Sequence, residues 1–207
     1  MIKPAPITAY VGVNGSGKSL SAVAFGIRDY EKNDRPLVTN MLGLSIPHVL
    51  IEGVEELPEI MEGLGTCNVL LDEAGAMFAA RDTGRNKAFE KVVQQLRKYD
   101  ARLLWTAPAF ARADKILREV TFMAVLCMPL LVSARDGKAW PSTRVTVQKA
   151  YDVSRIDNSG TTMNRNARAK GYGLIRTKKY ESAFDSFAVA GRLHLVQDLE
   201  RGKRAAR

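Results

Sequence analysis

Apolar and polar residues alternate along the first two thirds of the chain in a way that predicts strands and helices in turn. Ile7–Val11 is short, apolar and rich in strand-forming residues, and residues 20–30 then place apolar side chains at helical spacing. The same criteria predict further strands at 37–39, 68–73, 102–106 and 121–133, the last kinked at Pro129, and helices at 54–64, broken at Pro58, 87–99 and 109–118. This alternation predicts an α/β fold with a mostly parallel sheet and helices on both faces.

The pattern changes after residue 133. A second strand-like run at 143–148 follows Gly137, and the two runs together predict an antiparallel hairpin at one edge of the sheet. Residues 154–173 are rich in Ser, Asn, Thr, Gly and Arg without periodicity, which predicts a loop. We therefore divide the chain into a core with its edge hairpin, residues 1–153, and a basic C-terminal segment, residues 154–207, that packs on or extends from the same domain.

The composition excludes several classes of protein. With 207 residues, 46% of them hydrophobic and 26% charged, the chain has the make-up of a globular protein rather than a disordered or collagen-like one. Cys67 and Cys127 are too few for a disulfide framework, and His48 and His194 stand too far from them for a zinc site. No apolar run approaches the roughly 20 residues of a membrane-spanning helix. We expect a soluble protein with reduced thiols.

The charge is unevenly distributed. The chain carries 31 Lys and Arg against 22 Asp and Glu, a net charge of +9. Residues 1–103 hold 12 basic and 13 acidic side chains, whereas residues 104–207 hold 19 and 9, a balance of +10. A half-chain this basic favours a polyanionic partner, either nucleic acid or an acidic membrane surface.

The strongest motif lies between the first predicted strand and the first predicted helix. Residues 12–19, Gly-Val-Asn-Gly-Ser-Gly-Lys-Ser, match the phosphate-binding pattern G-x-x-x-x-G-K-S in full. Its glycines let backbone N–H groups surround phosphate oxygens, while Lys18 neutralises the β- and γ-phosphates and the Ser19 hydroxyl ligates Mg²⁺. The predicted nucleotide-binding residues are Gly12, Val13, Asn14, Gly15, Ser16, Gly17, Lys18, Ser19 and Leu20.

Two carboxylates end the buried strand at residues 68–73. The position of Asp72 suits a second contact to Mg²⁺, and the adjacent Glu73 suits a general base that polarises the attacking water. The alternative interpretation is a pair of acidic residues that caps the following helix. Because a phosphate loop lies upstream, the pair favours ATP hydrolysis over phosphoryl transfer to a metabolite.

The order of these motifs resembles the FtsK/HerA superfamily of P-loop ATPases. Residues 95–100, Gln-Leu-Arg-Lys-Tyr-Asp, and residues 103–108, Leu-Leu-Trp-Thr-Ala-Pro, extend the resemblance over about residues 7–135. Within the superfamily the chain is most similar to the zonula occludens toxin (Zot) family and to genome-packaging ATPases of tailless, membrane-containing viruses. The resemblance places Thr106 at the polar sensor position, where the superfamily usually has Gln.

The resemblance also implies an assembly. Superfamily members form rings, commonly hexamers, with ATP at subunit interfaces and an arginine finger from the neighbouring subunit. The candidates for that finger are Arg97, which lies in the family-like stretch, and Arg81, Arg85 and Arg118. The alternative for Arg97 is a surface ion pair. A viral portal or membrane vertex protein is the implied further partner, and the cytoplasm of the host cell or the virion is the implied location.

A basic stretch in the second half is the candidate for contacts with DNA. Its side chains suit phosphates and read no bases, as a translocating motor requires. The candidate contacts are Arg165, Arg168, Lys170, Arg176, Lys178 and Lys179, and the alternative is a solvated loop.

We predict a DNA-translocating ATPase that packages a viral genome into a preformed capsid. Zot-type assembly proteins carry a membrane-spanning helix after the ATPase domain, and this sequence has none, which favours packaging. The alternatives are a Zot-like ATPase for phage assembly or extrusion that works with a membrane or coat partner, a small-molecule P-loop kinase, and a nucleotide-binding switch without turnover.

Overall fold

The chain folds around one eight-stranded sheet. The structure, a computed structural model, describes residues 1–75, 83–133, 139–153 and 168–183. The strand order is β3-β2-β4-β5-β1-β6-β7-β8. The strands are β1 (Ile7–Val11), β2 (Leu37–Thr39), β3 (His48–Leu50), β4 (Asn68–Leu71), β5 (Arg102–Ala107), β6 (Met123–Ser133), β7 (Ala139–Asp152) and β8 (Gly171–Arg176). The first six strands in this order, from β3 to β6, all pair in parallel. β7 pairs in antiparallel with both β6 and β8, which confirms the predicted α/β fold with its antiparallel edge.

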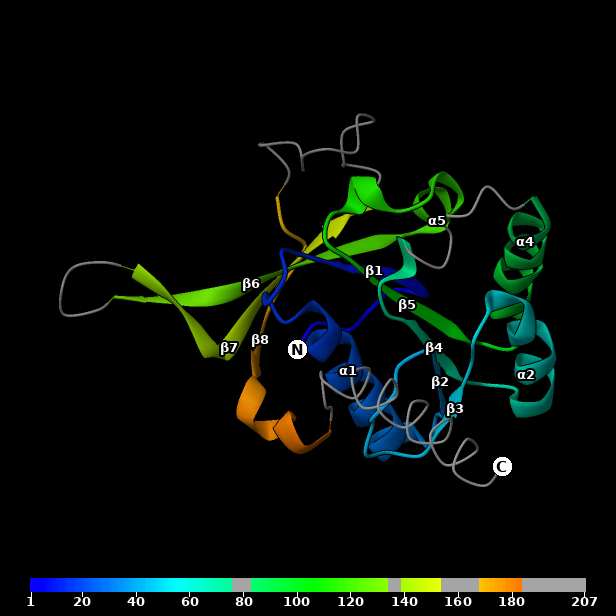
Figure 1. Ribbon diagram of the computed structural model, residues 1–207, viewed down its shortest axis with the longest axis horizontal. Coiled ribbons are helices and arrows are strands. Elements are labelled where there is room, and N and C mark those ends of the chain that lie inside the picture. The colour runs from blue at the N-terminus through cyan, green and yellow to red at the C-terminus, as the bar shows by residue number, and fades with distance from the viewer. Residues whose placement is uncertain (76–82, 134–138, 154–167, 184–207) are drawn as a thin grey trace, which may run out of the picture.

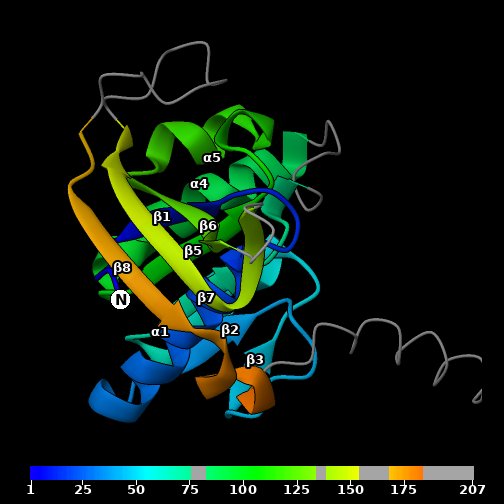
Figure 2. The ribbon, with the colours of Figure 1, turned by 90° about the vertical axis from the view of Figure 1, so that its left-hand side faces the viewer.

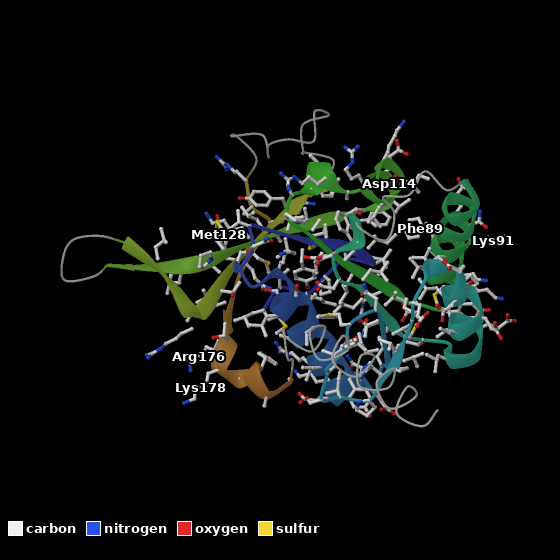
Figure 3. The ribbon with its side chains drawn as sticks, viewed as in Figure 1. Phe89, Lys91, Asp114, Met128, Arg176 and Lys178 are labelled. Atoms are coloured by element: carbon white, nitrogen blue, oxygen red, sulfur yellow. The ribbon has the colours of Figure 1, made fainter. Side chains whose placement is uncertain are left out.

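Helices cover both faces of the sheet (Figures 1 and 2). They are α1 (Lys18–Asn33), α2 (Leu57–Leu64), α4 (Thr83–Lys98) and α5 (Lys115–Val120), with short 3₁₀ turns η1 (Val54–Glu56), η2 (Phe110–Arg112), η4 (Thr177–Lys179) and η5 (Glu181–Ala183). α1 packs on one face, and α2, α4 and α5 pack on the other. On α4, Phe89 points toward the core and Lys91 points away from it (Figure 3).

The central strands are buried on both faces, as parallel strands between helical layers must be. Every residue of β1 and β4 is buried. Trp105 on β5 is fully buried, stacks on Phe110 at a centroid distance of 5.7 Å, and donates its indole N–H to the Thr121 hydroxyl at 3.0 Å. The core therefore holds the carboxyl ends of β1, β4 and β5 rigidly, and the sequence motifs lie at those ends.

Three local features of the half of the sheet that α2, α4 and α5 cover differ from the prediction. Pro58 does not break a helix but occupies the first turn of α2, where its missing N–H and fixed φ are tolerated. The edge strand β3 was missed because it has only three residues, too few for a periodic pattern. The predicted helix at 109–118 is divided at Asp114, whose carboxylate accepts the Ile116 N–H at 2.8 Å and begins α5 anew.

The predicted loop at 154–173 was wrong at its end, since residues 171–173 belong to β8. Along β8 the side chains of Tyr172, Leu174 and Arg176 are exposed, while Gly173 and Ile175 face the core. The two glycines weakened the strand pattern in the sequence. Residues 154–167 and 184–207, which make up most of the predicted basic C-terminal segment 154–207, lie outside the described residues.

The predicted hairpin is formed by β6 and β7. Their register shifts between Pro129 and Leu130, which confirms the irregularity predicted at Pro129. β8 pairs with β7 only as far as Val145, so the part of the hairpin beyond this point extends away from the helical layers (Figure 1).

A buried charge cluster ties α1 to the amino end of β5. Asp29, which is 6% exposed, accepts hydrogen bonds from Arg102 at 2.7 Å and from Asn68 at 2.8 Å, and it lies 3.4 Å from Arg35. Its other carboxylate oxygen accepts from Asn33 at 2.7 Å. The cluster fixes α1 against three segments of the chain.

We expect Asp29→Ala to lower the free energy of unfolding by about 3–5 kcal/mol, because Arg102 and Asn68 lose the buried carboxylate and Arg35 keeps only the exposed Asp100. Urea denaturation followed by far-UV circular dichroism measures the change. Glu31→Ala removes an exposed carboxylate from the same helix and is expected to have an effect below about 0.5 kcal/mol. Equal effects of the two substitutions would contradict the importance of the cluster.

Candidate active site

The phosphate-loop motif lies where the fold requires it, between the carboxyl end of β1 and the amino end of α1. The Gly12 N–H donates to the Ala107 carbonyl at 3.3 Å, and the Ser16 N–H donates to the Val13 carbonyl at 3.1 Å. Gly15 and Gly17 have φ angles of 77° and 83°, a region that other residues rarely adopt. The loop thus forms a turn whose exposed tip is Val13–Gly15.

Residues of the edge hairpin fix the back of this loop. A Cβ atom on Gly17 would lie 2.1 Å from the Thr146 hydroxyl on β7, and one on Gly12 would lie 2.4 Å from the Cys127 carbonyl on β6. Both glycines are therefore required by close packing. Thr146 was missed in the sequence, because nothing local to it indicates contact with a loop more than a hundred residues earlier.

The polar groups of the loop suit an anion. Lys18 is 7% exposed, and its Nζ donates to Asn14 Oδ1 at 3.5 Å, a long contact that leaves the ammonium able to bind a phosphate. The Ser16 hydroxyl is buried and makes no hydrogen bond within the described residues. Since buried polar groups are normally paired, this hydroxyl is a donor available to a ligand oxygen.

The groups behind the loop are uncharged at neutral pH. Burial raises the pKa of the Cys127 thiol to about 11, even though Sγ donates to the Ser21 hydroxyl at 3.5 Å. Burial also raises the pKa of Tyr10 well above its usual value. The two ionisable groups behind the loop, Cys127 and Tyr10, thus add no negative charge to the phosphate site.

Asp72 joins the phosphate loop to the neighbouring strands. Its Oδ1 accepts hydrogen bonds from the Ser19 hydroxyl at 2.7 Å and from the Thr106 hydroxyl at 2.6 Å. The predicted metal-binding pair, Ser19 and Asp72, therefore lies in direct contact. One hydroxyl and one carboxylate that point to the same place fit Mg²⁺, which takes few protein ligands and completes its shell with water and phosphate oxygens. No group of three or more His, Cys, Asp or Glu that would hold another metal occurs in the described ranges.

Glu73 is held in an uncommon backbone conformation beside Asp72. Its φ is 49°, and its side chain is exposed. Its N–H donates to the Thr106 hydroxyl at 2.9 Å. Thr106, which is fully buried, thus contacts both acidic residues, one through its carboxylate and the other through its backbone. Non-glycine residues in this region are strained and cluster at functional sites.

Asn40 is a further residue of the site that the sequence analysis missed. Its amide donates to the Asp72 carbonyl at 2.9 Å and accepts from the Asp72 N–H at 2.8 Å. The available signal was its place directly after β2, at the same edge of the sheet as the phosphate loop. Asn40 fixes the backbone from which both carboxylates project.

Comparison with known proteins places this geometry in a family. The family model described as Zonular occludens toxin (Zot) matches residues 7–135, more than half of the chain. The chain belongs to the Zot family. The match begins at β1 and includes the phosphate loop, both carboxylates and Thr106. No curated protein matches the chain.

Solved structures with the same fold include Zot and viral proteins. The N-terminal domain of zonular occludens toxin from Neisseria meningitidis aligns with a TM-score of 0.56 and 20% identity, over 86% of this chain and 98% of that one. The genome packaging NTPase of Sulfolobus turreted icosahedral virus 2 in complex with AMPPCP aligns with a TM-score of 0.52 and 14% identity, over 73% and 94%. These similarities confirm a P-loop NTPase fold for this Zot-family chain.

The arginine-finger candidates occupy different ends of the Zot-family fold. Arg97 is exposed in the last turn of α4, which leads to the amino end of β5 and so lies at the end of the sheet opposite the phosphate loop. The Arg118 guanidinium donates to the Ala113 carbonyl at 3.2 Å. Arg85 lies in the first turn of α4, but its side chain, like Arg81 as a whole, lies outside the described residues.

The candidate DNA contacts form two groups at opposite ends of β8. Arg168 and Lys170 precede the strand, and Lys170 lies 2.5 Å from Asp152, which partly neutralises it. Arg176, Lys178 and Lys179 end the strand and continue into η4, all exposed; Arg176 and Lys178 point outward in Figure 3. Arg165 lies outside the described residues. In the part of the chain that the structure describes, no helix is long and apolar enough to span a membrane.

We expect Thr106→Val to impair both stability and turnover. Valine has a similar shape but leaves Asp72 and the Glu73 N–H without their shared partner, at a cost of about 1–3 kcal/mol in the free energy of unfolding. Thr106→Ser keeps the hydroxyl and is the matched control. Chemical denaturation and steady-state ATP hydrolysis of both variants measure the effect, and similar losses in both would show that packing alone matters at this position.

Proposed function

We propose that this Zot-family chain is an Mg²⁺-dependent ATPase whose site is formed by residues 12–20 with Asp72, Glu73 and Thr106. The observation that carries the proposal is the contact of one Asp72 oxygen with both the phosphate-loop Ser19 and Thr106. It joins a phosphate-binding loop, a metal-binding pair and a candidate base at one edge of the sheet. A P-loop kinase for a metabolite has no such need of a carboxylate directed at water.

Each residue has a role set by its position. Lys18 and the backbone N–H groups of the loop bind the β- and γ-phosphates, while Ser19 and Asp72 hold Mg²⁺, which neutralises the charge that develops on the phosphates. Glu73 accepts a proton from the water that attacks the γ-phosphate. Thr106 positions the Asp72 carboxylate and the Glu73 backbone, and its short side chain would reach the γ-phosphate only through a water.

The active assembly is a ring, commonly a hexamer, in which a neighbouring subunit supplies an arginine to the γ-phosphate. Arg97 is our first candidate, because its exposed side chain lies far from the site of its own subunit and is available to another. Arg81, Arg85 and Arg118 are the alternatives. Residues 1–153 form the ATPase core, and residues 154–207 form a basic segment of the same domain.

The ring moves double-stranded DNA into a preformed viral capsid and meets a portal or membrane vertex protein there, in the host cytoplasm. The net charge of the second half of the chain and the exposed group Arg176, Lys178 and Lys179 support this role. The similarity to a genome packaging NTPase is in accord with it. The second candidate, an ATPase for phage assembly or extrusion, is favoured by the Zot family itself.

DNA binding by charge-reversed variants tests the DNA role. The triple variant Arg176→Glu, Lys178→Glu, Lys179→Glu is expected to weaken binding to long double-stranded DNA. The slope of log affinity against log salt should fall by about 1 for each DNA phosphate that the variant no longer neutralises. The control triple Lys91→Glu, Arg112→Glu, Lys115→Glu makes the same change of charge on exposed helical positions.

Equal salt slopes for the two triples would exclude this group as the DNA-binding surface. A wild-type chain that hydrolyses ATP, binds no DNA and instead binds membranes or a coat protein would favour the assembly role.

A further inference from the structure

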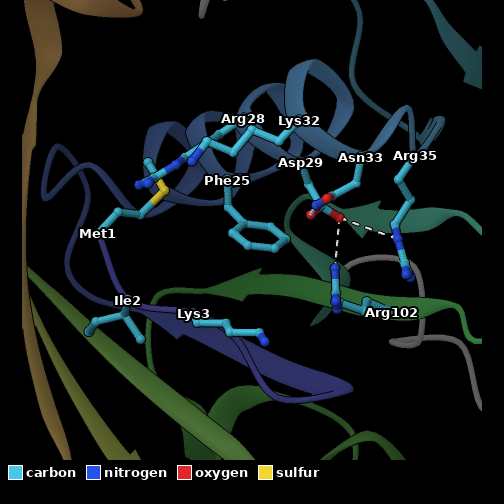
Figure 4. Close-up of a pocket in the computed structure, with 10 residues that line it drawn as sticks. All are labelled: Met1, Ile2, Lys3, Phe25, Arg28, Asp29, Lys32, Asn33, Arg35 and Arg102. Atoms are coloured by element: carbon cyan, nitrogen blue, oxygen red, sulfur yellow. Dashed lines mark hydrogen bonds and ion pairs between the residues drawn. The ribbon is translucent and has the colours of Figure 1, made fainter.

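A cavity lies at the end of the sheet opposite the phosphate loop. Its volume is about 490 Å³, and it opens between α1, the first residues of the chain and the amino end of β5 (Figure 4). Its lining residues are Met1, Ile2, Lys3, Phe25, Arg28, Asp29, Lys32, Asn33, Arg35 and Arg102. None of them belongs to the site described above.

The cavity carries positive charge that its own walls do not balance. Asp29 pairs with Arg35 and Arg102, but Lys3, Arg28 and Lys32 are exposed and form no ion pair within the described part of the chain. Arg28 and Lys32 lie one helical turn apart on α1, a spacing at which like charges destabilise a helix. A ligand with negative charge would relieve this repulsion.

The walls of the cavity also have an apolar part. The Phe25 ring lies between the cations of α1 and the first residues of the chain (Figure 4), and the side chains of Met1 and Ile2 lie nearby. An occupant therefore needs carboxylates or phosphates at its rim and an apolar group at its centre. This combination suits a protein surface better than a nucleic-acid backbone.

The chain itself has a surface with these properties on α2. Residues 36–80 contain no Lys or Arg, and the η1–α2 segment exposes Glu55, Glu56, Glu59 and Glu62. Glu56 accepts the N–H groups of Glu52 and Gly53 at 2.9 and 2.8 Å, whereas Glu59 forms no ion pair in the described ranges. Leu64 ends the helix with 39% of its side chain exposed.

The two surfaces of one chain cannot meet, because α1 and α2 lie on opposite faces of the sheet (Figures 1 and 2). Those of two chains can meet. A contact between different surfaces of identical chains is head-to-tail, and it repeats into a ring where the rotation between neighbours closes.

We propose that the cationic cavity receives the α2 surface of a second copy of the chain. Glu59 and Glu62 face Arg28 and Lys32, and Leu64 contacts Phe25. Lys98 of the same chain interacts with Glu62, so we expect Glu62 to contribute less than Glu59 to the contact with the second copy. The inference deepens the proposed ring and rests on the proposed function only for that assembly, not for hydrolysis. It places Arg97, in the last turn of α4 beside α2, at the end of the neighbouring sheet opposite the phosphate loop, so in this contact the arginine finger comes from another of the candidate arginines.

A charge exchange tests the contact. Sedimentation velocity over a range of protein and salt concentrations measures association of the wild type, of Arg28→Glu with Lys32→Glu, and of Glu59→Lys with Glu62→Lys. Each double variant alone is expected to weaken association at least about tenfold, since like charges then face each other. In an equimolar mixture, the acidic cavity of the first variant meets the basic α2 surface of the second, while the unchanged cavity and the unchanged α2 surface form the wild-type contact. The mixture is therefore expected to restore association. The control pair Lys91→Glu with Lys115→Glu leaves association unchanged.

The outcomes separate this contact from the proposed function. Undiminished association of both double variants overturns the inference. Loss of DNA binding in the Arg28 and Lys32 variant, with its association intact, also overturns the inference and would assign the cavity to nucleic acid. A wild type that stays monomeric overturns the contact and the ring. If each double variant associates more weakly and the mixture restores association, the contact is supported whether or not the wild type hydrolyses ATP. Absence of hydrolysis would reject only the proposed function. The exposed positions leave folding intact, which circular dichroism checks.

Discussion

Lys18→Ala is expected to lower kcat for ATP hydrolysis at least about 100-fold, because it removes the phosphate-loop cation that would stabilise the charge developing on the transferring phosphate. Lys18 is buried, and its only hydrogen bond among the described residues is the long contact to Asn14. Little native structure depends on the ammonium group, so the loss should appear in turnover and in ATP binding rather than in folding. Steady-state phosphate release and nucleotide titration measure the two effects.

Lys91→Ala is the matched control, since Lys91 is an exposed lysine in a helix on the other face of the sheet. It is expected to leave kcat unchanged. If the Lys18 variant retained wild-type hydrolysis, the phosphate loop would not be the catalytic site.

Glu73→Gln is expected to lower kcat by about 100- to 10,000-fold while leaving the affinity for ATP nearly unchanged. Glutamine has the same shape as glutamate but does not accept a proton from water. The Glu73 side chain is exposed and its backbone N–H is bonded to Thr106, so the substitution leaves the loop and the Ser19–Asp72 pair that would hold Mg²⁺ in place. The variant should therefore bind ATP without turning it over.

Glu90→Gln, an exposed position on α4, is the control for this substitution. Parallel losses of ATP affinity and kcat in the Glu73 variant would assign this residue to nucleotide binding instead. An unchanged kcat would remove it from the mechanism.

The sequence predicted the central part of the fold because strong local signals agreed there. The phosphate loop matches a complete motif, the strands around it are continuous apolar runs, and Asp72 and Glu73 directly follow one of them. Parallel strands bring their carboxyl ends to one edge, so residues at those ends meet irrespective of their distance in sequence. The contact of Ser19 with Asp72, 53 positions apart, is of this kind.

Other parts of the site depend on long-range packing and left no local signal. Asn40 follows a strand of three residues, and its reciprocal bonds to Asp72 exist only because β2 and β4 are neighbours in the sheet. Thr146 closes the back of the loop through a side chain on β7. A sequence alone does not specify strand order with enough certainty to predict either contact.

The basic stretch shows a different limitation. In the sequence it is one cluster, but β8 lies between its two described halves, and one lysine of the first half is paired with Asp152. Charge counted along the chain therefore overstated how many cations are available together. Among the described residues, Arg176, Lys178 and Lys179 at the end of β8 are exposed and form no ion pair, so they are available to bind phosphates.

Phosphate release by the wild-type protein, with and without long double-stranded DNA at low and moderate salt, tests the central proposal most directly. We predict Mg²⁺-dependent hydrolysis that DNA stimulates several-fold, with the stimulation disappearing as salt rises. ATP bound tightly in the presence of Mg²⁺ and DNA, under conditions in which the chain assembles, but without phosphate release, would contradict the proposed function.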